Sequence, residues 1–104
     1  MNERRENAVD AFEHEIAEEK AEALGRSGRK LEQALEMLRA HEQSRARGEP
    51  EAAAVRERLL WDLAESVESF VVQREACGLR DARHALELYD VPEEALVRVG
   101  VKRP

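Results

Sequence analysis

Cys77 lies seven residues before His84, across an expected turn, and these two residue types could serve as a nucleophile and a base. A nucleophilic cysteine needs a lowered pKa and a base within hydrogen-bond reach. Free cysteine is also among the most buried residue types, because it behaves as a small apolar side chain. Cys77 continues the apolar row of Phe70. The pattern therefore favours a core position over a catalytic one.

Two histidine motifs resemble parts of metal sites. His14 and Glu18 share one helix face, but a zinc peptidase signature requires a second histidine at position 18. Asp81 and His84 are spaced like one half of a di-iron motif, which needs a second copy and two further carboxylates. We therefore expect a solvated acidic face around His14 and a helix-capping role for Asp81. No metal ion, cofactor or catalytic residue is expected.

The segment 25–30, Gly-Arg-Ser-Gly-Arg-Lys, combines two glycines with three basic residues. Such a segment can form an anion-binding nest of backbone N–H groups. It is not a phosphate-binding P-loop, because the spacing differs and no strand precedes it. Gly28 lies on an apolar row of helical period, which favours a contact between helices at this position.

A polar cluster occupies the end of the second expected helix. Gln73, Arg74 and Glu75 sit among apolar neighbours, and Arg80 and Asp81 follow shortly after them. Buried polar groups are usually structural, and here they would pin the C-terminal helices. The functional alternative is that these five residues line a pocket for a partner or ligand.

The composition indicates one helical domain that spans residues 1–104. Charged residues make up 38% of the chain and hydrophobic residues 42%, while aromatic residues make up only 4%. The core must therefore consist mainly of Leu, Val and Ala. The net charge of −6 disfavours nucleic acid as a partner. A single cysteine and the absence of a long apolar run indicate a cytoplasmic protein without a membrane span.

The first helix is expected from residue 3 to about residue 47, where no proline occurs. Its apolar row opens with Val9, Phe12 and Ile16 and then continues from the next residue, again at spacings of three and four, through Ala17, Ala21, Leu24, Gly28, Leu31, Leu35 and Leu38. A break at 25–28 is the alternative to a continuous helix. We favour continuity because a break would scatter the register of the row.

Gly48-Glu49-Pro50 ends one helix and starts the next. The second helix is expected at 50–77, with two apolar rows that indicate contacts on two sides, from the C-terminal segment or from another subunit. Gly78 is expected to end it in a left-handed conformation. Two short helices should follow, at about 80–89 and 92–99. The expected fold is all-α, a long antiparallel helical hairpin followed by two short C-terminal helices.

Three stretches, ALGRSGRKLE (23–32), VQREACGLRD (72–81) and YDVPEEALVRVG (89–100), resemble a family of small all-helical bacterial proteins of unknown function. The resemblance covers about a third of the chain. It implies a compact helical protein of bacterial origin, and it carries no activity and no cofactor.

The expected function is non-catalytic, with the protein acting through self-association or contacts with an unknown protein. Residues 1–25 hold eight acids and three bases, and residues 26–47 hold three acids and six bases. An antiparallel homodimer along the first helix would place each acidic half beside a basic half. The second helix is the alternative interface. The alternative function is a DNA-binding regulator that uses residues 80–100 as a helix-turn-helix-like segment, although Glu93 and Glu94 would then face phosphates.

Overall fold

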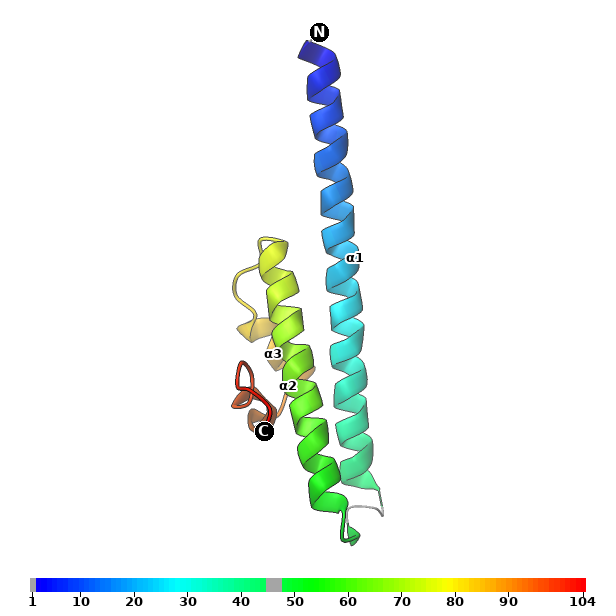
Figure 1. Ribbon diagram of the computed structural model, residues 1–104, viewed down its shortest axis with the longest axis vertical. Coiled ribbons are helices and arrows are strands. Elements are labelled where there is room, and N and C mark those ends of the chain that lie inside the picture. The colour runs from blue at the N-terminus through cyan, green and yellow to red at the C-terminus, as the bar shows by residue number, and fades with distance from the viewer. Residues whose placement is uncertain (1, 45–47) are drawn as a thin grey trace.

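The computed structural model describes residues 2–44 and 48–104, which form an elongated molecule of 71 × 26 × 21 Å (Figure 1). The described residues contain four helices and no strand. The first two form the antiparallel hairpin and the last two lie against the second helix, which confirms the expected fold class. The helices are α1 (Asn2–Gln43), α2 (Ala52–Ala76), α3 (Arg83–Tyr89) and α4 (Glu93–Leu96).

The helices are shorter than expected at several ends. α1 ends at Gln43 instead of residue 47, and the next residue, Ser44, donates its N–H and its hydroxyl to the carbonyl oxygen of His41 at 3.1 and 2.8 Å. Positions 45–47 lie outside the described residues. α2 begins two residues after Pro50. The helices expected at 80–89 and 92–99 are reduced to seven and four residues.

α1 runs without interruption through the segment 25–28, which confirms the continuous helix. Ser27 and Gly28 are buried at this point. A Cβ atom at Gly28 would lie 3.5 Å from the Tyr89 hydroxyl and 3.7 Å from a ring carbon of Phe70. These are ordinary van der Waals distances, so the expected contact between helices exists at Gly28 and leaves space for a methyl group.

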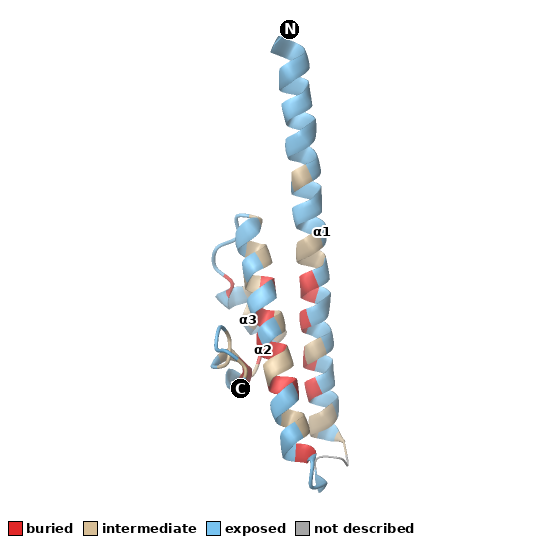
Figure 2. Ribbon diagram, viewed as in Figure 1, coloured by how far each residue is buried: buried red, intermediate tan, exposed pale blue. Residues whose placement is uncertain are grey.

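The core lies between the C-terminal half of α1 and the whole of α2, and the C-terminal segment closes its other side (Figure 2). Leu60 and Leu63 of α2 are 0% exposed, and Ala64 is 2% exposed. The second apolar row of α2, which comprises Leu60, Ala64 and Val71, is therefore buried or half-buried within this chain, on a helix that α4 contacts. The buried cluster comprises Leu31, Leu35, Leu38, Leu59, Leu60, Leu63, Val67, Phe70, Val91 and Ala95.

α2 ends in the conformation that the sequence predicts. Gly78 has φ of 81°, and its N–H donates to the carbonyl oxygen of Glu75 at 2.9 Å. The N–H of Leu79 donates to the carbonyl oxygen of Arg74 at 2.8 Å. These two bonds form a Schellman motif, in which glycine accepts the left-handed conformation without a steric penalty.

Asp90 ends α3 in the same way, with φ of 56°, and does not cap α4. Its N–H donates to the carbonyl oxygen of Glu87 at 3.0 Å, and that of Val91 donates to Leu86 at 3.3 Å. α4 starts instead from Pro92, whose extended backbone turns the chain onto α2.

The packing at Gly28 leads to a prediction of opposite effects for a small and a large side chain. Gly28→Ala should raise the free energy of unfolding by about 0.5–1 kcal/mol, because alanine favours the helix and its methyl group fits. Gly28→Leu should lower it by about 1–3 kcal/mol through overpacking. Urea denaturation measures both. The matched control is Gly25→Leu, because a Cβ there meets only the end of the Arg29 side chain, at 3.4 Å. Equal stability of the two leucine variants would contradict the account.

Candidate interaction surface

The predicted polar cluster divides into a contact and a group of solvated side chains. Arg74 donates from Nη2 to the backbone oxygen of Asp81 at 3.1 Å, and its guanidinium carbon lies 5.8 Å from the ring centroid of Phe70. Arg74 therefore ties the end of α2 to the segment before α3. Glu75 and Arg80 are exposed, and Gln73 is half-buried. The structural role proposed for the cluster thus falls on Arg74 and Asp81.

Asp81 bonds to the start of α3, as the sequence indicates, but it stands one residue before the N-cap position, Ala82. Its Oδ1 atom accepts a hydrogen bond from the N–H of Arg83, the first residue of α3, at 3.0 Å. This hydrogen bond is the main cause that lowers the pKa of Asp81, and the charge of Arg83 adds to it. Since its carboxylate is held by the start of α3, Asp81 stabilises the helix terminus.

The histidine motifs form no metal centre among the described residues, where no group of three or more His, Cys, Asp and Glu side chains is placed to hold an ion. His14 Nε2 lies 2.9 Å from Glu18 Oε1, and their side chains are 75% and 64% exposed. This pair is the solvated helix face that the sequence predicts. His84 is also exposed.

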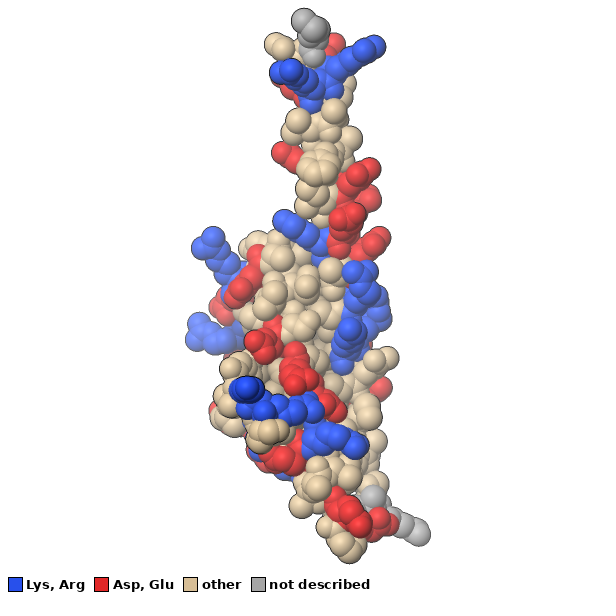
Figure 3. All heavy atoms as spheres, viewed as in Figure 1, with Lys and Arg blue, Asp and Glu red and all other residues tan. Residues whose placement is uncertain are grey.

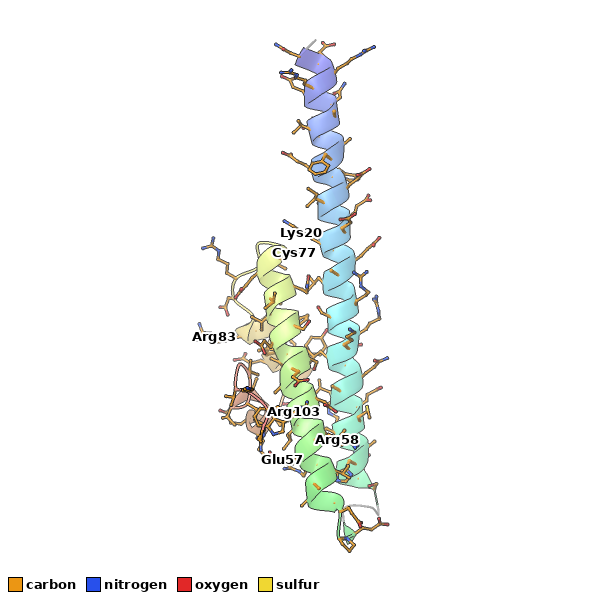
Figure 4. The ribbon with its side chains drawn as sticks, in the orientation of Figure 1. Lys20, Glu57, Arg58, Cys77, Arg83 and Arg103 are labelled. Atoms are coloured by element: carbon orange, nitrogen blue, oxygen red, sulfur yellow. The ribbon has the colours of Figure 1, made fainter. Side chains whose placement is uncertain are left out.

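Cys77 does not lie in the core, so the core position expected for it is wrong. It follows the last residue of α2, is half-buried, and places Sγ 3.5 Å from the backbone oxygen of Lys20 on α1 (Figure 4). N-terminal to Lys20, most of α1 is left uncovered by the described residues of the chain. The apolar row of α2 therefore reaches the edge of the packed region at Cys77.

The C-terminal segment is held on α2 by arginine ion pairs. Arg56 donates to both carboxylate oxygens of Glu94 at 2.6 and 2.7 Å, and to Glu42 of α1 at 2.6 Å. Arg98 lies over the ring of Trp61, 5.7 Å from its centroid, and donates to both carboxylate oxygens of Glu57 at 2.9 and 3.0 Å. Arg103 extends the series with a 2.7 Å contact to Asp62. The geometry is bidentate at Glu94 and Glu57. Among exposed ion pairs, this arrangement contributes most to stability.

These ion pairs bear on the DNA-binding alternative. α4, which would serve as the recognition helix, has four residues and no basic side chain. Arg98 stands just after it, but its side chain is only 21% exposed and is paired with Glu57. The basic side chain that follows α4 is thus held within the monomer, and α4 itself begins with two acidic residues, Glu93 and Glu94.

The N-terminal arm, residues 2–22 of α1, extends beyond the end of α2 and has no intramolecular cover for most of its length (Figure 2). Within it only Ile16 is half-buried, and every other residue is exposed. Val9 is 53% exposed and Phe12 is 62% exposed. Two large apolar side chains are thus exposed on a stretch of helix that is otherwise mainly polar.

A groove of about 670 Å³ lies where α2 stops against the N-terminal arm. Its lining is mainly apolar, and it includes Lys20 and Cys77, which meet where Cys77 Sγ contacts the Lys20 backbone oxygen (Figure 4). The residues that line it are Glu13, Ile16, Ala17, Lys20, Ala21, Leu24, Ala76 and Cys77. The groove joins the end of the folded core to the exposed apolar residues of the arm.

The structure divides the apolar row of the first helix into two. From Leu24 to Leu38 it is covered by α2, while Val9 and Phe12 remain uncovered. Successive residues are about 100° apart around a helix, so Val9, Phe12 and Ile16 lie about a quarter-turn from the row that faces α2. A dimer interface along the whole row from Val9 to Leu38 is therefore excluded, because Leu31, Leu35 and Leu38 are already buried within the chain.

Comparison with known proteins adds no assignment. No family model, curated protein or solved structure matches the sequence. The resemblance to a bacterial family of unknown function therefore stays a prediction. No described helix is long and apolar enough to cross a membrane.

The ion pairs of the C-terminal segment predict a specific pH dependence. Hydrogen bonds from Arg56 are the main cause that holds the pKa of Glu94 below its ordinary value of 4.5. A carboxylate with a lowered pKa contributes its full stabilisation above pH 4.5 and loses it as the pH falls through the folded-state value. The free energy of unfolding should therefore fall with acidification below this pH, and less steeply in Glu94→Gln.

Chemical denaturation at a series of acidic pH values measures this slope. Arg56→Gln is the matched variant, because it removes the donor and leaves Glu94 in place. It should reduce the slope as Glu94→Gln does. Slopes in both variants that equal the wild-type slope would show that the pair does not anchor the segment.

Proposed function

We propose that this protein is a non-catalytic helical interaction protein, and that its N-terminal arm packs along a helix outside its own monomer. The observation that carries this proposal is the exposure of Val9 and Phe12, at 53% and 62%, on the stretch of α1 that no other described part of the chain covers. The partner is a second copy of the chain or an unknown protein, in a reducing cytoplasmic compartment of a bacterium.

The energetics of helices support an external partner for the arm. Most helical stability in proteins comes from packing an apolar face, and short unpacked helices are marginal in water. Val9, Phe12 and Ile16 provide such a face in the arm. Burial of each of these side chains would contribute about 1.5–3 kcal/mol to the free energy of binding, before the costs of association. A helix laid along a groove with anchors at spacings of three and four residues is a common recognition mode.

The rest of the chain holds the C-terminal half of α1 in place, and the arm continues from this half. Residues 24–43 of α1 are held against α2, and α2 is held by the C-terminal segment through Arg56, Arg98 and Arg103. Because α1 is one uninterrupted helix, the packed half provides a nucleus from which the arm continues. The protein therefore presents a preformed helix at one end.

Site-specific photo-crosslinking tests the proposal in the cells that produce the protein. Benzoylphenylalanine at position 12 replaces Phe12 with a similar ring and should give a discrete crosslinked product. The control position is Gln33, which is exposed on the packed half of α1. A product at position 12 and none at position 33 is the expected result. Equal yields at both positions, or no product at position 12, would contradict the proposal.

A further inference from the structure

The exposed apolar residues of the arm belong to a row that carries opposite charges at its two ends. Arg5, Val9, Phe12, Ile16 and Glu19 follow one another at spacings of four, three, four and three residues, so they share one face of α1. Arg5 lies seven residues before Phe12, and Glu19 lies seven residues after it. We call these five residues the arm row.

We propose that the partner of the arm row is the arm row of a second copy, packed antiparallel with the twofold axis near Phe12. This inference rests on the proposed function and names its partner. In this arrangement the Phe12 side chains meet, Val9 of each copy packs on Ile16 of the other, and Arg5 of each copy pairs with Glu19 of the other. A twofold axis makes each of these contacts except the central one occur twice.

Charge selects the antiparallel arrangement over the parallel one. Parallel arms in register would place Arg5 beside Arg5 and Glu19 beside Glu19, and would also align the acidic residues between them. Antiparallel arms replace both repulsive contacts at the ends of the row with attractive ones. Figure 3 shows basic side chains at the N-terminal tip of α1 and acidic side chains lower on the arm.

The position of the arm row leaves room for a second helix. It lies about a quarter-turn around α1 from the residues that face α2. The C-terminal segment contacts α1 elsewhere: Tyr89 donates its hydroxyl to Glu32 at 3.4 Å and accepts from Arg39 at 3.1 Å through its backbone oxygen. At 100° per residue, Glu32 and Arg39 lie on the other side of the α2-facing row. A second arm therefore approaches without displacing α2 or α3.

The groove at the end of α2 lies near the first turns of the partner's arm. In antiparallel arms, the first turns of one copy run past residues 16–22 of the other, and the groove lies beside these residues. Ile16 belongs to both the arm row and the groove lining. One partner helix thus covers the exposed apolar side chains and reaches the edge of the groove at Ile16, while Ala17, Ala21 and Leu24 stay on the side of α1 that faces α2.

Analytical ultracentrifugation of the full chain tests the partner identity. We expect a dimer at about 100 μM, a concentration at which micromolar affinity is visible. Phe12→Asp should weaken it at least 100-fold and leave the helical circular dichroism of the packed region unchanged. The matched control is Met37→Asp, because Met37 is 57% exposed on α1 but lies outside the arm. A wild-type monomer at this concentration, or a dimer that survives Phe12→Asp, overturns the proposal.

Charge exchange tests the antiparallel orientation. Arg5→Glu and Glu19→Arg should each weaken the dimer about tenfold, because each places like charges together at both ends of the interface. The double variant Arg5→Glu/Glu19→Arg should restore it, since the pairs are then re-formed with reversed sign. A double variant as weak as the single variants overturns the orientation.

Crosslinking of introduced cysteines provides a direct distance test in a Cys77→Ser background. With a short bis-maleimide, the chain that carries both Arg5→Cys and Glu19→Cys should form covalent dimers. Each single cysteine variant should not, because position 5 of one copy lies far from position 5 of the other. Dimers from the single variants would show a parallel arrangement and overturn the proposal.

The two proposals fail in different ways. A monomer in ultracentrifugation together with a photo-crosslink from position 12 to a different protein would overturn the second copy and retain the interaction function. Loss of the position-specific photo-crosslink together with a monomer would overturn both.

Discussion

The difference in length between the two long helices determines the rest of this structure. α1 has 42 residues and α2 has 25, so α2 can cover only the C-terminal part of α1. The covered part contributes Leu31, Leu35 and Leu38 to the core. The N-terminal arm of α1 is left uncovered by the described residues for most of its length, although it carries Val9 and Phe12. Because α2 is shorter than α1, the antiparallel hairpin cannot cover both halves of α1, and the N-terminal half is left as an exposed arm.

The C-terminal segment packs on α2, beside the C-terminal half of α1. α2 carries two apolar rows, and Val91 and Ala95 of the C-terminal segment belong to the same buried cluster as Leu60. The turns at Gly78 and Asp90 bring the chain back along α2, and arginine pairs with Glu57, Asp62 and Glu94 hold it there. Arginine suits this task because its planar guanidinium can meet a carboxylate with two bonds at once. Arg56 and Arg98, the basic side chains bonded on either side of α4, are therefore engaged in ion pairs within the monomer.

Helix positions and caps were predictable from the sequence because they depend on local chemistry. The continuous first helix, the turn at Gly78 and the hydrogen bond between Asp81 and the start of α3 all follow from residue type and spacing. The division of the apolar row was not predictable in the same way. The rows before and after Ile16 differ by a quarter-turn, and only the end of α2 at Ala76 shows which one is covered. Cys77 was misplaced for the same reason, because the row of α2 continues to the point where α1 no longer offers a buried face.

The central claim is that the N-terminal arm gains its support from outside the monomer. Hydrogen–deuterium exchange resolved along α1 tests this claim most directly, because backbone amides report local packing. At about 1 μM, residues 5–20 should exchange much faster than residues 27–40, and at about 100 μM they should become protected. Residues 5–20 protected as strongly as residues 27–40 at the lower concentration would contradict the account.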